Sequence, residues 1–168
     1  MYKRISILFL LVSICMVGLL SGCNTSAYNN KNAIIADEDS YTYRKSNDEG
    51  STDSSLNREF AGFSGKDTIW TLEAETKTDI SINLSTDLEK GKFKVLLVTS
   101  NDDIEILLEG EGTKDETIEI EAGTSRIIIV GDDASGICQI SFGDLNGVVL
   151  KNSRTDMNFD DWFSDWMN

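Results

Sequence analysis

The sequence predicts an all-β protein that contains a single antiparallel β-sandwich, jelly-roll-like in form. Between about residue 58 and residue 152, apolar and polar residues alternate with a period of two, which is typical of strands with one buried face. Turn-forming sequences such as EKG, SNDD and GDDASG separate these runs. The runs recur roughly every 9 to 14 residues, close to the spacing of sandwiches and barrels.

The first 22 residues have the features of an export signal. Two basic residues open the chain, and the apolar run Ile5–Leu20 is shorter than the about 20 residues that span a membrane. The run closes on Leu20-Ser21-Gly22-Cys23, which resembles the lipobox of bacterial lipoproteins. The resemblance implies cleavage before Cys23, a diacylglycerol on its thiol and a place on the extracytoplasmic face of the cell membrane. A plain secretory signal and an uncleaved anchor helix are the alternatives.

Residues 23–57 are predicted to be the lipidated cysteine and a disordered linker. NTSAYNNKN and SNDEGSTDSS contain too few apolar residues to form a core. As a random coil this stretch would span roughly 30 Å. The segment Asn32–Ala36, with Tyr41 and Tyr43 beyond it, is the exception, and it is read as an added strand, a contact site or a partly ordered linker.

The predicted domain, residues 58–152, places one set of apolar side chains on the inner face of its strands. The run RIIIVG carries apolar residues on both faces, as expected of a central strand covered on both sides. The inward residues predicted by alternation are Trp70, Leu72, Ala74, Ile80, Ile82, Leu84, Phe93, Val95, Leu97, Ile104, Ile106, Leu108, Ile118, Ile120, Cys138, Ile140 and Phe142.

The stretch from Gly91 to Gly131 resembles a group of small lipoproteins from Gram-positive bacteria. In that group a G-x-F-K-V start leads through an E-G-x-G turn to a G-x-x-R-I-x-I-V-G strand, and all three patterns occur here. These motifs are structural glycines and core positions. The resemblance therefore implies the fold and assigns no activity.

The net charge excludes some classes of binding partner, and the cysteine content excludes a disulfide bond within the mature chain. The chain has 15 basic and 29 acidic residues, and its first 22 residues hold two of the basic ones and no acid, so the remainder carries a formal charge of −16. Such a surface repels nucleic acid and anionic lipid. Cys15 lies in the signal and Cys23 is predicted to carry lipid, so Cys138 has no cysteine to pair with.

The residue inventory predicts a protein without catalytic residues. The chain has no histidine, which removes Ser-His-Asp and Cys-His nucleophiles and the usual zinc sites. An acid-only hydrolase would need two carboxylates facing each other across a cleft. Pairs such as Glu73 with Glu75 and Glu119 with Glu121 instead occupy outward strand positions, so solvated faces are the simpler interpretation.

Two ligand classes remain as alternatives. Asp102 and Asp103, and Asp132 and Asp133, lie in predicted loops and supply the oxygen ligands that Ca²⁺ takes, although Asp is also common in turns. Carbohydrate suits a jelly-roll-like fold, but Trp70 falls on the inner face, where core packing is the simpler interpretation.

The C-terminal segment, residues 153–168, is predicted to be an acidic and aromatic tail with a short helix. Phe159, Trp162, Phe163 and Trp166 fall at i, i+3, i+4 and i+7, which puts four rings on one helical stripe. The tail is expected to dock on its own domain, with a partner's groove and the membrane interface as alternatives.

Together these features predict a lipid-anchored, extracytoplasmic and non-catalytic protein that binds or scaffolds another component of the cell envelope. A glycan-binding or Ca²⁺-stabilised cell-wall module is the first alternative. A carboxylate-only hydrolase is the second. Apart from the lipid on Cys23, no cofactor is predicted, and the sequence leaves the oligomeric state open.

Overall fold

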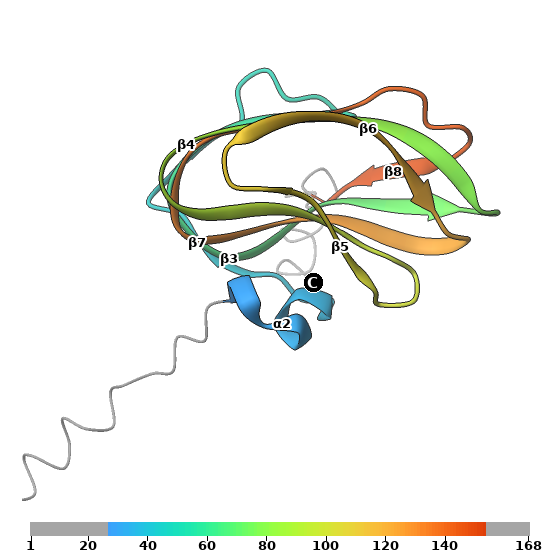
Figure 1. The fold of residues 1–168 in the computed structure, drawn as a ribbon, viewed down its shortest axis with the longest axis horizontal. Helices are drawn as coiled ribbons and strands as arrows, with labels where there is room; N and C mark the ends of the chain where they lie inside the picture. Colours follow the sequence, from blue (N-terminus) through green and yellow to red (C-terminus); the bar gives the residue numbers. More distant parts are fainter. Residues whose placement is uncertain (1–26, 154–168) are drawn as a thin grey trace, which may run out of the picture.

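The computed structural model describes residues 27–153, which form one eight-stranded antiparallel sheet that is not closed (Figure 1). The all-β class and the antiparallel pairing are therefore confirmed. A 3-10 turn and a short helix precede the strands. The elements are η2 (Ala27–Asn29), α2 (Lys31–Ile35), β1 (Ser40–Thr42), β2 (Lys45–Asn47), β3 (Ser55–Ala74), β4 (Thr78–Val98), β5 (Ile104–Glu109), β6 (Gly112–Ile120), β7 (Gly123–Phe142) and β8 (Val149–Asn152).

Three long strands, β3, β7 and β4, run side by side through the sheet, and each bends near its middle (Figure 1). The β3–β7 register shifts between Phe60 and Gly65, and the β4–β7 register shifts between Leu88 and Lys92. We call the two sides of this bend the β6 half, which also contains β2, and the β5 half, which also contains β1 and β8. The bend turns the two halves toward each other.

The main core lies between the two halves. The Trp70 ring, from the β5 half, meets the Phe142 ring, from the β6 half, at a centroid distance of 5.1 Å. Trp70 is buried, and its indole N–H donates to the backbone oxygen of Asp53 at 2.7 Å. Most of the predicted inward residues are confirmed as core: Trp70, Leu72, Ala74, Ile80, Ile82, Leu84, Phe93, Val95, Leu97, Ile118, Ile120, Cys138 and Ile140.

The predicted facing of β5 (Ile104–Glu109) is wrong for Ile104, which packs on the outer-face cluster, and for Ile106, whereas Leu108 packs against the main core as predicted. Leu107 is the buried residue, at 2% exposure, whereas Ile106 is 48% exposed. The β4–β5 pairing explains this, because Val95 pairs with Leu108 while Leu96 pairs with Ile106, so Leu107 is an extra residue at a bulge. A one-residue shift moves side chains to the opposite face, and simple alternation does not anticipate it.

The structure also differs from the predicted disordered linker. Residues 27–57 contain η2, α2, β1, β2 and the first residues of β3. The outer face of the β5 half is apolar, and Ala27, Tyr28 and Ile34 cover it. This second cluster accounts for the predicted two-sided burial of RIIIVG, which is confirmed. The sheet residues of the cluster are Leu96, Val98, Ile128 and Val130.

Strand pairing and buried cations hold this N-terminal segment in place. β1 and β2 pair with β3, and the Asp39 carboxylate accepts hydrogen bonds from the backbone N–H and the hydroxyl of Thr68. Lys66, which is 1% exposed, donates to the backbone oxygen of Ala36. A segment of low average hydropathy is thus ordered by a few well-placed apolar and polar contacts.

Several predicted features lie outside the described residues. These are the signal, the lipobox residues Leu20, Ser21, Gly22 and Cys23, and the aromatic tail with Phe159, Trp162, Phe163 and Trp166. Within residues 27–153, no helix has the length and apolar character needed to cross a membrane.

Candidate functional site

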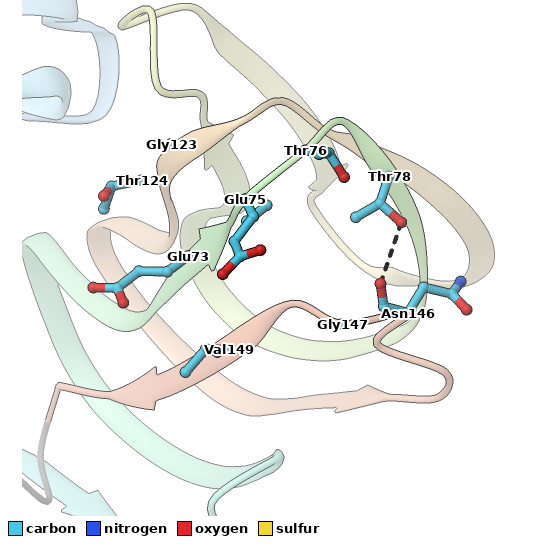
Figure 2. A pocket seen from close by; sticks show the side chains of 10 residues that line it. Glu73, Glu75, Thr76, Thr78, Gly123, Thr124, Asn146, Gly147 and Val149 are labelled. Atoms are coloured by element: carbon cyan, nitrogen blue, oxygen red, sulfur yellow. Dashed lines mark hydrogen bonds between the residues drawn. The ribbon is translucent and has the colours of Figure 1, made fainter.

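An open pocket of about 440 Å³ lies at one end of the folded sheet (Figure 2). The β3–β4 turn, the β6–β7 turn and the loop before β8 form its walls. Asn146 and Gly147 both have positive φ, of 45° and 87°, and make the tight turn that brings this loop to the pocket. The lining residues are Glu73, Ala74, Glu75, Thr76, Thr78, Gly123, Thr124, Asn146, Gly147 and Val149.

The pocket offers hydroxyl and carboxylate oxygens. The Glu73 carboxylate accepts from Lys151 Nζ at 2.6 Å, and Thr78 Oγ1 donates to the backbone oxygen of Asn146 at 3.4 Å. The Glu73 and Glu75 carboxylates point in different directions (Figure 2). The lining contains no cysteine to act as a nucleophile. Its hydroxyl and carboxylate groups can exchange hydrogen bonds with a polar ligand.

A second candidate is the outer face of the β6 half, which we call the polar face. It forms a shallow hollow of about 300 Å³ across β3, β7, β4 and β6. Its outward side chains are short and hydrogen-bonding, with one carboxylate among them. They are Ser55, Asn57, Asn83, Ser85, Thr113, Asp115, Gln139 and Ser141.

Strand register arranges the polar face in two rows. The first row is Thr113, Ser85, Gln139 and Asn57, and the second is Asp115, Asn83, Ser141 and Ser55. Within the first row Gln139 Nε2 donates to Asn57 Oδ1 at 3.1 Å, and the hydroxyls of Ser85 and Thr113 lie 3.2 Å apart. At about 4.8 Å between strands, each row spans about 14 Å of hydrogen-bonding surface.

The two aspartate pairs considered as alternative calcium ligands lie in a polar turn and in ion pairs. Asp102 has a positive φ of 61°, and the backbone N–H of Asp103 is bonded to Thr99 Oγ1, as in an ordinary polar turn. Asp132 lies 3.7 Å from Lys92, and Asp133 pairs with Lys90 at 2.8 Å. Within the described part of the chain, no three acidic or cysteine side chains gather to hold a metal ion.

A buried ionic cluster, which the sequence pattern does not predict, joins the two halves. Arg58 is fully buried and donates to Asp67 at 2.7 Å, to the Tyr43 hydroxyl at 2.9 Å and to both carboxylate oxygens of Asp48. Burial raises the pKa of the Asp67 carboxyl, although the Arg58 guanidinium opposes the shift. One feature of the sequence does indicate that Arg58 is buried. It lies between Leu56 and Phe60 at alternate positions of β3, and these positions face the core.

Cys138 is a core residue. It is fully buried, and this burial raises the pKa of its thiol to about 12. A thiol with such a pKa is almost entirely protonated near neutral pH, so it is a poor nucleophile and a poor metal ligand. The predicted role of Cys138 as a small apolar side chain is confirmed by its burial.

No protein-family model, curated protein or solved structure matches this chain. The resemblance of Gly91–Gly131 to small Gram-positive lipoproteins stays a prediction.

Proposed function

We propose that this chain is a lipid-anchored, extracytoplasmic and non-catalytic protein that binds or scaffolds another component of the cell envelope. The observation that carries the proposal is the apolar run Ile5–Leu20, closed by a lipobox-like sequence at Cys23 and followed by a folded domain from Ala27. Two acyl chains on Cys23 would make a stable anchor, whereas one chain binds only marginally.

A binding role fits the chemistry of the domain. The chain has no histidine, and the thiol of Cys138 is buried. The two hollowed surfaces present oxygen and amide groups that are open to solvent. Such groups suit the recognition of a polar partner through hydrogen bonds.

The proposal is tested first by a Cys23→Ser variant expressed at native level. The lipid anchor predicts that the normal protein is found in the membrane fraction and the variant is not, with both folded. Equal membrane retention of the variant would contradict lipid anchorage. A Ser21→Ala variant is the control, since a small residue is kept there and membrane retention should be unchanged.

The partner is then sought by crosslinking in living cells, comparing the full lipoprotein with a version that ends at Thr155. Capture of one envelope protein by the full form, and its loss from an equally stable short form, would assign docking to the aromatic tail. Unchanged capture would assign docking to the domain. Failure of both forms to capture any envelope component would contradict a scaffolding role.

A glycan of the cell wall is the second candidate partner, and the polar face favours it. We assign the folded sheet to the jelly rolls, a class that includes lectin domains. The pairing supports this assignment. Split at the bend, the three long strands give six segments, which with β5 and β6 make eight in chain order. They are arranged 1-8-3-6 in the β6 half and 2-7-4-5 in the β5 half.

Binding of the domain to a purified neutral wall polysaccharide tests this second candidate. Asn83→Ala with Gln139→Ala should abolish binding, because both amides lie at the centre of the polar face. Asn101→Ala, in an exposed turn, is the matched control and should bind normally. Binding that survives the double substitution would remove the polar face as the glycan site.

A further inference from the structure

The η2–α2 segment offers a specific orientation on the membrane. We infer that the surface formed by η2 and α2 lies against the lipid headgroups, and that the polar face is turned away from them. The inference rests on the lipid anchor proposed above. In this arrangement the domain is held close to the bilayer in a preferred orientation and does not extend from it on a long tether.

The N-terminal segment is firmly attached to the sheet. Tyr28 and Ile34 are 5% and 3% exposed. The Tyr28 hydroxyl donates to Glu109 Oε1 at 2.8 Å, and the Lys94 ammonium lies 4.1 Å from the centre of the Tyr28 ring. A cation over an aromatic ring is attractive, and more so when it is shielded from water. Ala27 is therefore a fixed point of the domain.

The far end of α2 is fixed as well. Arg126 donates to the backbone oxygens of Ile35 and Ala36, at 2.6 and 2.9 Å, and Lys66 also donates to Ala36. Cations at the C-terminal end of a helix bind carbonyl groups that have no partner within the helix. The whole segment from Ala27 to Ala36 thus moves with the sheet.

Only three residues, Asn24, Thr25 and Ser26, separate Cys23 from Ala27. Even fully extended, the four steps from Cys23 to Ala27 reach at most about 14 Å. A lipidated Cys23 lies at the membrane surface, so Ala27 must stay within this distance of it. The domain has no room to rise on a tether of the roughly 30 Å predicted from composition.

The charge of the η2–α2 surface also favours its contact with the headgroups. The first carboxylate after Cys23 is that of Asp37, and Lys31 is the charged residue of the intervening stretch. Lys92, with a side chain 63% exposed, lies 5.9 Å from the centre of the Tyr28 ring, although Asp132 balances its charge. The mature chain as a whole is strongly acidic, whereas residues 27–36 carry one cation and no carboxylate, so anionic headgroups repel this segment less than the average of the chain.

The polar face lies on the other side of the folded sheet. The η2–α2 segment packs on the outer face of the β5 half, and the main core separates that half from the β6 half (Figure 1). Packed sheet layers are about 10 Å apart, so the polar face is at least that much farther from the headgroups. It would face the cell wall, free to meet a partner.

The test uses the full lipoprotein in vesicles of phosphatidylcholine and phosphatidylglycerol that contain a headgroup nitroxide quencher. One fluorophore is attached at Asn32→Cys, on α2, or at Asn83→Cys, on the polar face; both positions are exposed, and the native Cys138 is buried. Quenching should be several-fold stronger at position 32. Inserting 20 Gly and Ser residues between Asn24 and Thr25, a coil of about 25 Å, should remove the difference.

The possible outcomes test the orientation and the lipid anchor independently. Equal quenching at the two positions, or stronger quenching at position 83, in protein that sediments with the vesicles would overturn the orientation and leave the anchor intact. Protein that does not sediment would overturn the anchor and the orientation with it. Unchanged melting temperatures for both labelled variants serve as the folding control.

Discussion

The Arg58 guanidinium lies 2.7 Å from the Asp67 carboxylate, and the two residues come from opposite halves of the bent sheet. Both are buried, and Tyr43 and Asp48 complete their hydrogen bonds. The cluster therefore ties the two halves to each other and to the segment around β2. A buried charge is tolerated only while its partners are present.

Removing Arg58 should strongly destabilise the fold. Arg58→Leu leaves the Asp67 carboxylate buried without its cation, which should lower the free energy of unfolding by about 3–5 kcal/mol. The double variant Arg58→Leu with Asp67→Leu should be less destabilised, because the buried pair is removed together. Denaturant unfolding of the chain from Asn24 onward measures both.

An exposed ion pair supplies the control. Lys45 and Glu59 lie 2.6 Å apart, with side chains 60% and 52% exposed. Lys45→Leu should change stability by less than about 1 kcal/mol. If Arg58→Leu were no more destabilising than Lys45→Leu, the buried cluster would have no special role.

Two glycines with the same backbone angle should respond differently to alanine. Gly91 and Gly110 both have φ of 78°, but a Cβ at Gly91 would collide with the backbone of Asp133 and Ala134, whereas Gly110 has open space. Gly110→Ala should cost about 1–2 kcal/mol, from the left-handed conformation alone. Gly91→Ala should cost more, by about 1–3 kcal/mol for the collision. Equal melting temperatures for the two variants would contradict the close packing of Gly91 against the backbone of Asp133 and Ala134.

Alkaline pH should destabilise the protein through Cys138. Folding raises the pKa of this thiol to about 12, against about 8.5 in an unfolded chain. Its contribution to stability is complete below the unfolded value and is lost as pH rises toward the folded one, at about 1.4 kcal/mol per pH unit. The stability difference between the native chain and Cys138→Ala should therefore shrink between pH 8 and pH 10. A constant difference would show that the thiol does not titrate differently on folding.

The N-terminal segment should detach locally when its apolar contact is removed. Ile34 is 3% exposed and packs in the cluster beneath α2. Ile34→Ala should weaken this contact by about 2–4 kcal/mol and speed tryptic cleavage after Lys31. Asn32→Ala, at an exposed position of the same helix, should leave the cleavage rate unchanged. Equal rates for the two variants would contradict the fixed position of the segment.

Alternation along the strands predicted most of the main core because each of these strands has one inward face. It succeeded for Ile118 and Ile120, which are buried at the expected positions. It failed at Leu107, since a bulge depends on how β5 pairs with β4, and pairing is not visible within one strand.

The prediction of a disordered linker over residues 27–57 failed because it used average composition, which does not reveal contacts with distant residues. Averaged over the stretch, the apolar content is low, yet Tyr28 and Ile34 meet an apolar face made by distant residues such as Val98 and Val130. Arg58 was overlooked because its partners, Asp48 and Asp67, come together only in the folded chain. The pocket and the polar face likewise depend on contacts between strands that are far apart in sequence.

Mass spectrometry of the mature N-terminus is the decisive test of the lipid anchor on Cys23. Protein purified from membranes would be digested with trypsin, and the peptide from Cys23 to Lys31 analysed. A lipid-anchored protein should yield a peptide that begins at Cys23 and carries the added mass of a diacylglycerol. A peptide with an unmodified Cys23, or a chain that still begins at Met1, would contradict the lipid anchor and the orientation inferred from it.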